Sequence, residues 1–595
     1  MALAPETVRC APADRRPPYR ALAAALACIY PAFWLAQFAL GSLPGLVRLA
    51  AGGELKAVRL SPLGSFILSA PTDPSEMGRV AYSSFRSGML STIIVAIVLG
   101  AVVLVLTRHR AGLPGGLFAA MLGSLGFERL LRQLWDQSPG VGWFVSAAIL
   151  LLLWILGLRR VIAVLPLPST GFGWRLAGAL AGFTVPLGVL WLALHWTLGM
   201  SLMRRLVWLF VPGLLPACLA ALKPLSAAAA KPKLPAWRWV AASAAISATV
   251  AAALARAGPP VGRSFNLARA ARAQAMVASL PEIPSGAPYA REFFQRGVNF
   301  TAEFPDPYAS VDALRALDRL APYGVDAVAL VAFGWCSPRR PAVRMNTDIN
   351  SWESDQGITD LARLAHSRGM KVMLKPQLWV PGGSATNLDF RDAPDREQWF
   401  EQYSAFLDHY ARLAVEIHAD LFTVGVEMAR LSRYEADWRR LIAGVRQIYP
   451  GPLVYAANFG PDFQNVAFWD ALDYIGLDEY YPLPADLSTA DLVRRVERVA
   501  IEFRRPVLFT EVGFSSFAHP ERRPWDLSPR RLSLDDQARC YQAIFQAFYA
   551  KPWFAGMYWW NVGTDGAGGS SDGSFSPWGK PAMEVVRNWY LGGNR

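Results

Sequence analysis

Eight short β-rich runs, separated by longer amphipathic patterns, constrain the fold of the second half of the chain. The runs occupy residues 296–300, 325–333, 370–376, 420–426, 452–457, 473–478, 506–510 and 555–561. Helical patterns such as SVDALRALDRLAPYG and GITDLARLAHSRG fill the gaps and end in Gly, which often stops a helix. Strands that alternate with helices in this way are typical of βα units and a parallel sheet. Eight such units in residues 291–595 predict a (β/α)8 TIM barrel.

The first half of the chain has a different composition. Up to residue 260 it holds 23 Lys and Arg against 7 Asp and Glu, while the remainder holds 36 against 39. No acidic residue lies between Asp136 and Glu282. A bilayer core is crossed by roughly 20 apolar residues in a helix, and six runs approach this length: 21–42, 89–107, 140–158, 173–199, 206–222 and 239–255. Residues 1–256 therefore predict an α-helical polytopic membrane bundle, with the Gly-rich run 112–127 as an optional seventh span.

Basic residues at the ends of apolar runs bear on the topology of this bundle. If the N-terminus with Arg9, Arg15, Arg16 and Arg20 is cytoplasmic, seven spans place the barrel outside the cell and six place it inside. The seven-span reading predicts an integral protein of a bacterial cytoplasmic membrane, with the lipid bilayer as a partner and an extracytoplasmic barrel. A Pro- and Gly-punctuated linker is expected over 257–290. The polar half shows no basic patch with interleaved aromatics, which argues against nucleic-acid binding, and protein partners stay open.

Two glutamates end predicted buried strands. In ADLFTVGVEM, Glu427 closes the fourth strand, and in RPVLFTEVGF, Glu511 closes the seventh. Catalytic groups of such barrels stand at the carboxyl ends of strands, so the two can face one another across the barrel. Paired carboxylates suit glycoside hydrolysis, retaining at a separation of about 5 Å and inverting at about 6.5 to 9.5 Å. A structural ion pair is the alternative for either residue. Asp478 and Glu479 are rival carboxylates, which we interpret as neighbours that tune the site or bind the substrate.

A longer set of motifs carries a family resemblance. The run VMLKPQLWV, QWFEQYSAFLDHYARLA, ADLFTVGVEM, FWDALDYIGLDEYYPL, RPVLFTEVGFSS and GMYWWNV resembles glycoside hydrolase family 113 of clan A, whose known members are β-mannanases. The resemblance covers essentially all of 293–590 and none of the apolar half. It implies that Glu427 is the general acid/base and Glu511 the nucleophile of a retaining double displacement. Many clan A members carry Asn before the acid/base, where this chain has Val426, so Asn458 is the expected partner of the sugar 2-hydroxyl.

Further residues at or near strand ends are expected to contact substrate. Tyr480 is expected to donate a hydrogen bond to Glu511, and burial beside Met428 to raise the pKa of Glu427. Four tryptophans offer flat apolar faces to pyranose rings, the last two being the first choice: Trp335, Trp379, Trp559 and Trp560. Three polar side chains on strand ends are expected to reach sugar hydroxyls: Asn299, Lys375 and Gln377.

Other chemistries lack their motifs. GSSDG at 569–573 matches G-x-S-x-G but lies in a Gly-rich loop without a strand-to-helix elbow. The sequence contains no H-E-x-x-H, P-loop or dinucleotide fingerprint, so no metal and no cofactor are expected.

Three functional hypotheses remain from the sequence. The leading one is a membrane-tethered retaining glycoside hydrolase that cleaves a β-linked, mannan-type oligo- or polysaccharide. The second is a transglycosylase or glycan-modifying enzyme with the same carboxylates. The third is a non-catalytic glycan-binding barrel that serves a membrane bundle in transport or sensing.

Overall fold

The computed structural model describes residues 54–59, 66–70, 237–283, 293–338, 340–381 and 383–592, together with Phe38, Ser42, Leu46, Leu49, Ala50 and Tyr289. The chain divides into two compact units. One consists of Met1–Thr72 with Val80–Gly262, and the other of Asp73–Arg79 with Arg263–Arg595. The barrel lies in the second unit.

The described part of the first unit contains a hairpin that the sequence did not predict. Strands β1 (Glu54–Arg59) and β2 (Phe66–Ala70) pair antiparallel. Helix α7 (Trp237–Val277) follows much later in the chain and runs 41 residues. It includes Pro259 and Pro260, so the predicted linker over 257–290 is helical as far as Val277.

The membrane prediction needs correction. Across the stretches that the structure describes, no helix has both the length and the apolar character needed to cross a bilayer. The span predicted over 239–255 lies in α7, and 9 of the 17 residues of this span are Ala, which buries less apolar surface than Leu, Ile or Phe. The polytopic membrane bundle was therefore wrong as a fold class, and the integral-membrane localisation was wrong with it. The other predicted spans lie outside the described residues, apart from Phe38 and Ser42.

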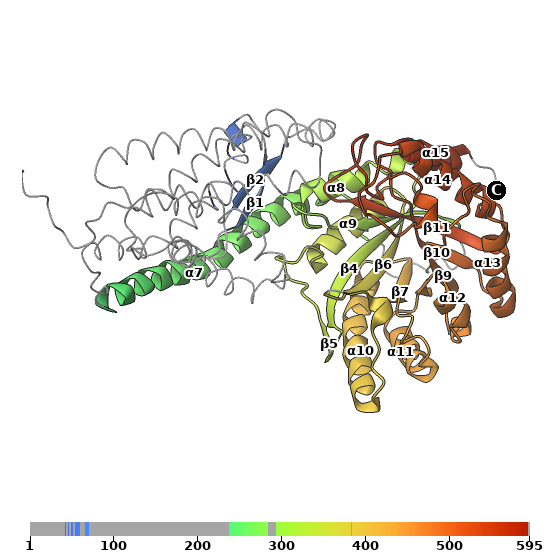
Figure 1. Cartoon of the computed structure of the whole chain (residues 1–595), viewed down its shortest axis with the longest axis horizontal. Helices are drawn as coiled ribbons and strands as arrows, with labels where there is room; N and C mark the ends of the chain where they lie inside the picture. The colour runs from blue at the N-terminus through green and yellow to red at the C-terminus, as the bar shows by residue number, and fades with distance from the viewer. Residues whose placement is uncertain are drawn as a thin grey trace, which may run out of the picture. The chain divides into compact units, whose positions relative to one another are not determined.

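Eight parallel strands close a barrel, which confirms this part of the fold prediction (Figure 1). They are β3 (Gln295–Thr301), β4 (Ala327–Ser337), β6 (Lys371–Trp379), β7 (Leu421–Val426), β8 (Leu453–Asn458), β9 (Tyr474–Glu479), β10 (Val507–Val512) and β11 (Phe554–Gly563). Neighbours in the ring follow chain order, and β3 pairs with both β11 and β4 to close it. One further strand, β5 (Arg340–Arg344), adds antiparallel to the end of β4 and was not predicted.

Helices follow the strands, as the amphipathic patterns predict. They are α8 (Val311–Asp318), α9 (Asp355–Ser367), α10 (Ala393–Glu416), α11 (Glu435–Ile448), α12 (Pro461–Asn465), α13 (Ala490–Phe503), α14 (Leu534–Phe548) and α15 (Pro581–Gly592). Ser310 and Ser354 begin α8 and α9, and each hydroxyl accepts a backbone N–H of the first turn. The connection after β8 carries the short α12 and a 3-10 helix, Trp469–Ala471.

Two apolar clusters stabilise the barrel. The larger joins strand residues that face outward to the buried faces of the helices. The smaller fills the barrel interior with residues from seven strands: Ala327, Ala329, Met373, Leu421, Val454, Tyr474, Leu508, Ala555 and Tyr558. Because side chains alternate along a strand, residues two or four positions beyond this interior layer also point inward, toward the carboxyl end of the barrel.

Candidate active site

Both strand-end glutamates follow an irregularity in strand pairing. In β10 the register against β9 shifts between Phe509 and Glu511, which sets Glu511 opposite Asp478. In β7 the register against β8 shifts between Thr423 and Val426. Such bulges redirect the side chains that follow them. Local geometry at both positions therefore departs from a regular strand.

Glu427 comes directly after the second irregularity and has left-handed backbone geometry, with φ of 52°. This conformation is uncommon outside Gly and costs on the order of 1 kcal/mol or more. Residues of this kind gather at functional sites, where surrounding structure holds them in place.

Glu511 is held by a donor on each carboxylate oxygen. The Lys375 ammonium lies 2.5 Å from Oε1, and the Tyr480 hydroxyl donates to Oε2 at 2.9 Å. Glu511 is 5% exposed, and the chain separations of 136 and 31 residues show that only the closed barrel assembles this arrangement. The two contacts fix the direction of the carboxylate and place a positive charge beside it.

Glu427 has a different environment. Its only described side-chain partner is the amide of Asn458, whose Nδ2 donates to Oε1 at 3.0 Å. Its side chain keeps partial exposure to solvent. The pKa of Glu427 lies well above its ordinary value, because burial disfavours the charged form and the negative charges of Asp478 and Glu511 add to that effect.

Lys375 is fully buried under Glu511. Its ammonium also lies 3.4 Å from Asn299 Oδ1 and 3.4 Å from the Thr510 carbonyl oxygen, and 3.8 Å from Asp478. Asn299 is fully buried as well, and its amide donates to the carbonyls of Thr510 and Tyr558. Lys375 and Asn299, predicted to reach sugar hydroxyls, are thus in contact with protein groups that support Glu511.

Asp478 and Glu479 are both buried carboxyl groups on β9. Thr510 donates to Asp478 Oδ1 at 2.7 Å, and burial together with the Glu511 charge raises the pKa of Asp478 to about 8. Glu479 accepts the Tyr481 backbone N–H at 3.0 Å, and burial raises its pKa to about 8. Asp478 points toward Lys375 and Glu511, and we call these three groups the charged centre. Glu479 points away from it, since neighbouring strand residues face opposite sides.

The four predicted tryptophans separate into two groups. Trp559 is 0% exposed and stacks on Tyr541 with ring centroids 3.7 Å apart, so it belongs to the core. Trp560 is partly exposed, and its ring lies 5.6 Å from the Lys375 ammonium. Trp335 and Trp379 are 52% and 53% exposed at the ends of β4 and β6. Three of the four therefore stand where a ligand could meet them.

Gln377 stands on β6 two residues beyond Lys375. It is partly exposed, and within the described stretches its side-chain oxygen has no hydrogen-bond partner.

Three polar residues that the sequence did not suggest surround Asn458. Its amide also donates to Thr386 Oγ1 at 3.0 Å. Its backbone N–H donates to Asp462 at 2.9 Å, and Ser432 donates to the other oxygen of Asp462 at 2.6 Å. Thr386 lies in a short 3-10 helix, Ser432 in a turn and Asp462 in the short α12, where neither strand ends nor periodicity mark them.

The sequence also did not indicate the exposed aromatic surface next to Asn458. The ring of Phe459 stacks on Trp525, with centroids 5.1 Å apart and Trp525 43% exposed.

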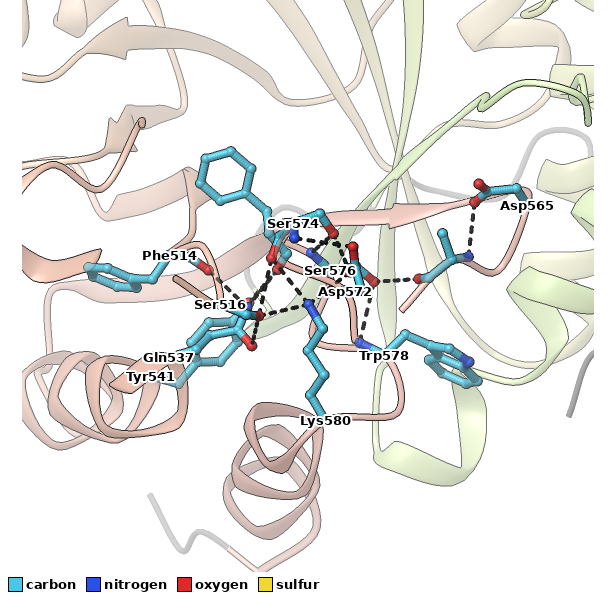
Figure 2. A network of polar contacts seen from close by, with 12 residues as sticks. Phe514, Ser516, Gln537, Tyr541, Asp565, Asp572, Ser574, Ser576, Trp578 and Lys580 are labelled. Atoms are coloured by element: carbon cyan, nitrogen blue, oxygen red, sulfur yellow. Dashed lines mark hydrogen bonds and ion pairs between the residues drawn. The ribbon is translucent and has the colours of Figure 1, made fainter. Parts of the chain in front are cut away.

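A buried polar network joins the loops that follow β10 and β11 (Figure 2). The Lys580 ammonium donates to Ser516 Oγ at 2.7 Å and to the Ser574 carbonyl at 3.2 Å. It also pairs with Asp572 at 2.9 Å, and burial lowers the pKa of Lys580. One lysine thereby fixes two loops at the carboxyl end of the barrel.

The same network ends beside Tyr480. Gln537 donates to the carbonyls of Phe514 and Phe575 at 2.9 and 3.0 Å (Figure 2). The Phe575 ring then packs against Tyr480, with centroids 6.2 Å apart. Loop packing therefore supports the tyrosine that donates to Glu511.

Comparison with known proteins identifies the barrel. Residues 301–579 match the model of Glycoside Hydrolase Family 113. The GH113 β-mannanase AaManA from Alicyclobacillus acidocaldarius, solved in complex with ManMIm, is 33% identical over 51% of this chain and 98% of that chain, with a TM-score of 0.47. A GH113 β-1,4-mannanase solved as a complex is 28% identical over 50% of this chain and 99% of that chain, also with a TM-score of 0.47. No curated protein matches the chain. Through its barrel the chain belongs to Glycoside Hydrolase Family 113, and it is a glycoside hydrolase.

Proposed function

We propose that the chain hydrolyses a β-linked, mannan-type glycan by a retaining double displacement, with Glu511 as nucleophile and Glu427 as general acid/base. The observation that carries this assignment is the contrast between the two carboxyl groups. Glu511 accepts hydrogen bonds from an ammonium and a hydroxyl, and Glu427 has a pKa well above its ordinary value. Two carboxyl groups in such different environments can take different roles, one as proton donor and the other as nucleophile.

In the first step Glu427, protonated because its pKa is raised, donates its proton to the glycosidic oxygen. A carboxylate oxygen of Glu511 attacks the anomeric carbon as the glycosidic C–O bond breaks. The leaving sugar departs with the proton. The products of this step are a glycosyl ester on Glu511 and an ionised Glu427.

In the second step the ionised Glu427 accepts a proton from water while the water oxygen attacks the anomeric carbon. The ester bond to Glu511 breaks, and its carboxylate is regenerated. Two inversions at one carbon give net retention, which agrees with the retaining chemistry of the family.

Lys375 and Tyr480 are assigned to orientation of the nucleophile. Each contacts a different oxygen of Glu511, so rotation of the carboxyl group would break at least one of the two contacts. Pre-set donors of this kind cost no reorganisation during reaction. Asn458, whose amide donates to Glu427, is assigned to the sugar 2-hydroxyl.

The mannan-type substrate is supported by the relative of 33% identity, which is described as a β-mannanase. Trp560 and Gln377 are partly exposed side chains beside the charged centre and are assigned to the sugar rings there.

Product stereochemistry tests the proposal. The full chain is incubated with a linear β-1,4-manno-oligosaccharide, and the first reducing-end anomer is followed by proton NMR. Retention releases the β-anomer first. Initial release of the α-anomer would exclude Glu511 as a nucleophile.

Azide assigns the two roles separately. Glu511→Ala with azide and an activated aryl β-mannoside is expected to form the α-glycosyl azide, because azide enters the face that the nucleophile leaves open. Glu427→Ala is expected to form the β-glycosyl azide from the covalent intermediate. Glu435→Ala, an exposed change on α11, is the matched control and should behave as wild type.

A further inference from the structure

A small exposed sheet extends from the active site and is lined by tryptophan and arginine. Strands β4 and β6 continue in register to Trp335 and Trp379, and β5 adds antiparallel along β4. Three strands thus form a shelf beyond the barrel. We call the side chains of Trp335, Trp379, Arg340 and Arg344 the shelf face.

Strand alternation places the shelf face on the same side as the active site. Met373 lies in the barrel interior, and Lys375, Gln377 and Trp379 follow it at intervals of two along β6. On β4, Ala329 lies in the interior, and Trp335 has the same parity. Cys336 points the other way, since it accepts a hydrogen bond from Trp399 of α10.

The two tryptophans lie side by side and are about half exposed. Their ring centroids are 6.4 Å apart at an interplanar angle of 61°. At about 3.3 Å per residue, Trp379 stands roughly 13 Å along β6 from Lys375. A sugar on this surface therefore lies beyond the ring that undergoes cleavage.

Two arginines of β5 complete the shelf face. Arg344 pairs directly with Trp335, and Arg340 pairs with Ser337, so their side chains share the face of Trp335. Both arginines are exposed, and neither forms an ion pair within 4.0 Å with a carboxylate among the residues that the structure describes. Gln402 of α10 accepts the Val343 N–H at 3.0 Å and fixes β5 in place.

We propose that the shelf face binds a portion of the glycan that carries carboxylate groups, so that the substrate is an acidic rather than a neutral mannan-type chain. The tryptophans supply apolar surface for sugar rings. The guanidinium groups supply planar forks that match a carboxylate. Two exposed cations with no carboxylate close by among the described residues complement an anionic ligand better than a neutral one. The inference rests on the proposed function, because it deepens the description of that substrate.

The test compares binding of two ligands to the full chain carrying Glu511→Ala, which prevents turnover. One ligand is a linear β-1,4-manno-oligosaccharide, and the other is the same oligosaccharide with carboxymethyl groups. Calorimetry at low ionic strength is expected to give about fivefold tighter binding of the carboxymethylated ligand, the scale of an exposed charge pair. Added salt is expected to reduce the ratio.

Variants then locate the preference. Arg340→Gln with Arg344→Gln should bring the ratio of the two Kd values close to one, and Arg344→Glu should turn the preference toward the neutral ligand. Arg494→Gln, an exposed change on α13, is the control and should keep the wild-type ratio. Equal or weaker binding of the acidic ligand, or a preference that survives the double substitution, overturns the inference.

Turnover by the wild-type chain separates this inference from the proposed function. If the neutral oligosaccharide is cleaved and no acidic preference exists, the shelf inference fails and the proposed function stands. If the acidic ligand binds with the expected preference and neither ligand is cleaved, the proposed function fails.

Discussion

Glu427 and Glu511 are the same side chain at equivalent ends of two barrel strands, yet their surroundings differ. Glu511 has a cation on one oxygen and a hydroxyl on the other. Glu427 has one neutral amide donor, a left-handed backbone and two nearby carboxyl groups that raise its pKa further than burial alone. The neighbours that the barrel places around each carboxyl group, and not the residue type, therefore distinguish the two glutamates.

The largest effect on kcat is expected from replacing each of the two glutamates in turn. Glu511→Gln should lower kcat by about 10⁴-fold or more on any substrate, because no attacking oxygen of comparable nucleophilicity remains. Glu427→Gln should lower kcat by roughly 10² to 10⁴-fold on an oligosaccharide but far less in the first step with a dinitrophenyl leaving group, which departs without a proton. Steady-state and burst kinetics on both substrates measure the contrast. Equal losses on the activated substrate would contradict the assignment.

The next largest effect concerns the cation beside Glu511. Lys375→Met should lower kcat by about 10² to 10³-fold, because the nucleophile loses the donor on Oε1. It should also lower Tm, because Asp478 and Glu511 lose the positive charge between them. Asn458→Ala removes the one donor that the described residues supply to the Glu427 side chain, and is expected to cost less. Kinetics and thermal melting of both variants test the ranking, and a larger loss for Asn458→Ala would reverse it.

The pH profile sharpens the comparison further. Activity needs the protonated form of Glu427, so the alkaline limb of kcat/KM reports loss of that proton. Asp478 has a pKa of about 8, so in the alkaline range it ionises and its charge raises the pKa of Glu427. Asp478→Asn removes this charge, so the alkaline limb should move to lower pH. The measurement is kcat/KM between pH 4 and 10 for wild type and variant. A limb that moves to higher pH would show that the sign is wrong.

The smallest effect is expected at Glu479, a buried carboxyl group outside the charged centre. Its folded pKa is about 8, above the unfolded value, so it favours the folded state at low pH and this contribution is lost as pH rises through 8. Glu479→Gln should therefore gain stability relative to wild type as pH rises from the unfolded pKa of 4.5 to the folded pKa of about 8, and should keep a gain of about 1 kcal/mol or more at pH 9, with little change in kcat. Denaturant unfolding at pH 5 and pH 9 measures it. A difference in stability that does not change with pH would contradict the burial argument.

The strands of the barrel could be predicted because their signal is local. Each predicted run overlaps its observed strand, and Glu427 and Glu511 were found because they interrupt an apolar run. The added strand β5 was not predicted, since RPAVR is short and contains Pro, which is usually a signal against a strand. Apolar runs in the first half favoured membrane spans, but hydropathy alone does not establish a spanning helix.

Partners across the barrel were harder to predict. Lys375 was expected to reach sugar, but its ammonium lies against Glu511, 136 residues away in the chain. Trp559 and Trp560 are identical residues at adjacent positions, yet Trp559 is in the core and Trp560 is near the charged centre. Side chains alternate between the two faces of β11, which separates them, and a one-residue shift in register would exchange their faces.

By itself the sequence determined the number and order of the barrel strands and which carboxyl groups stand at their ends, because alternation and chain order are local properties. Only the tertiary structure decided which groups meet there: the cation on Glu511, the amide on Glu427 and the arginines beside Trp335. These contacts depend on register, bulges and closure of the ring, which bring together residues far apart in the chain.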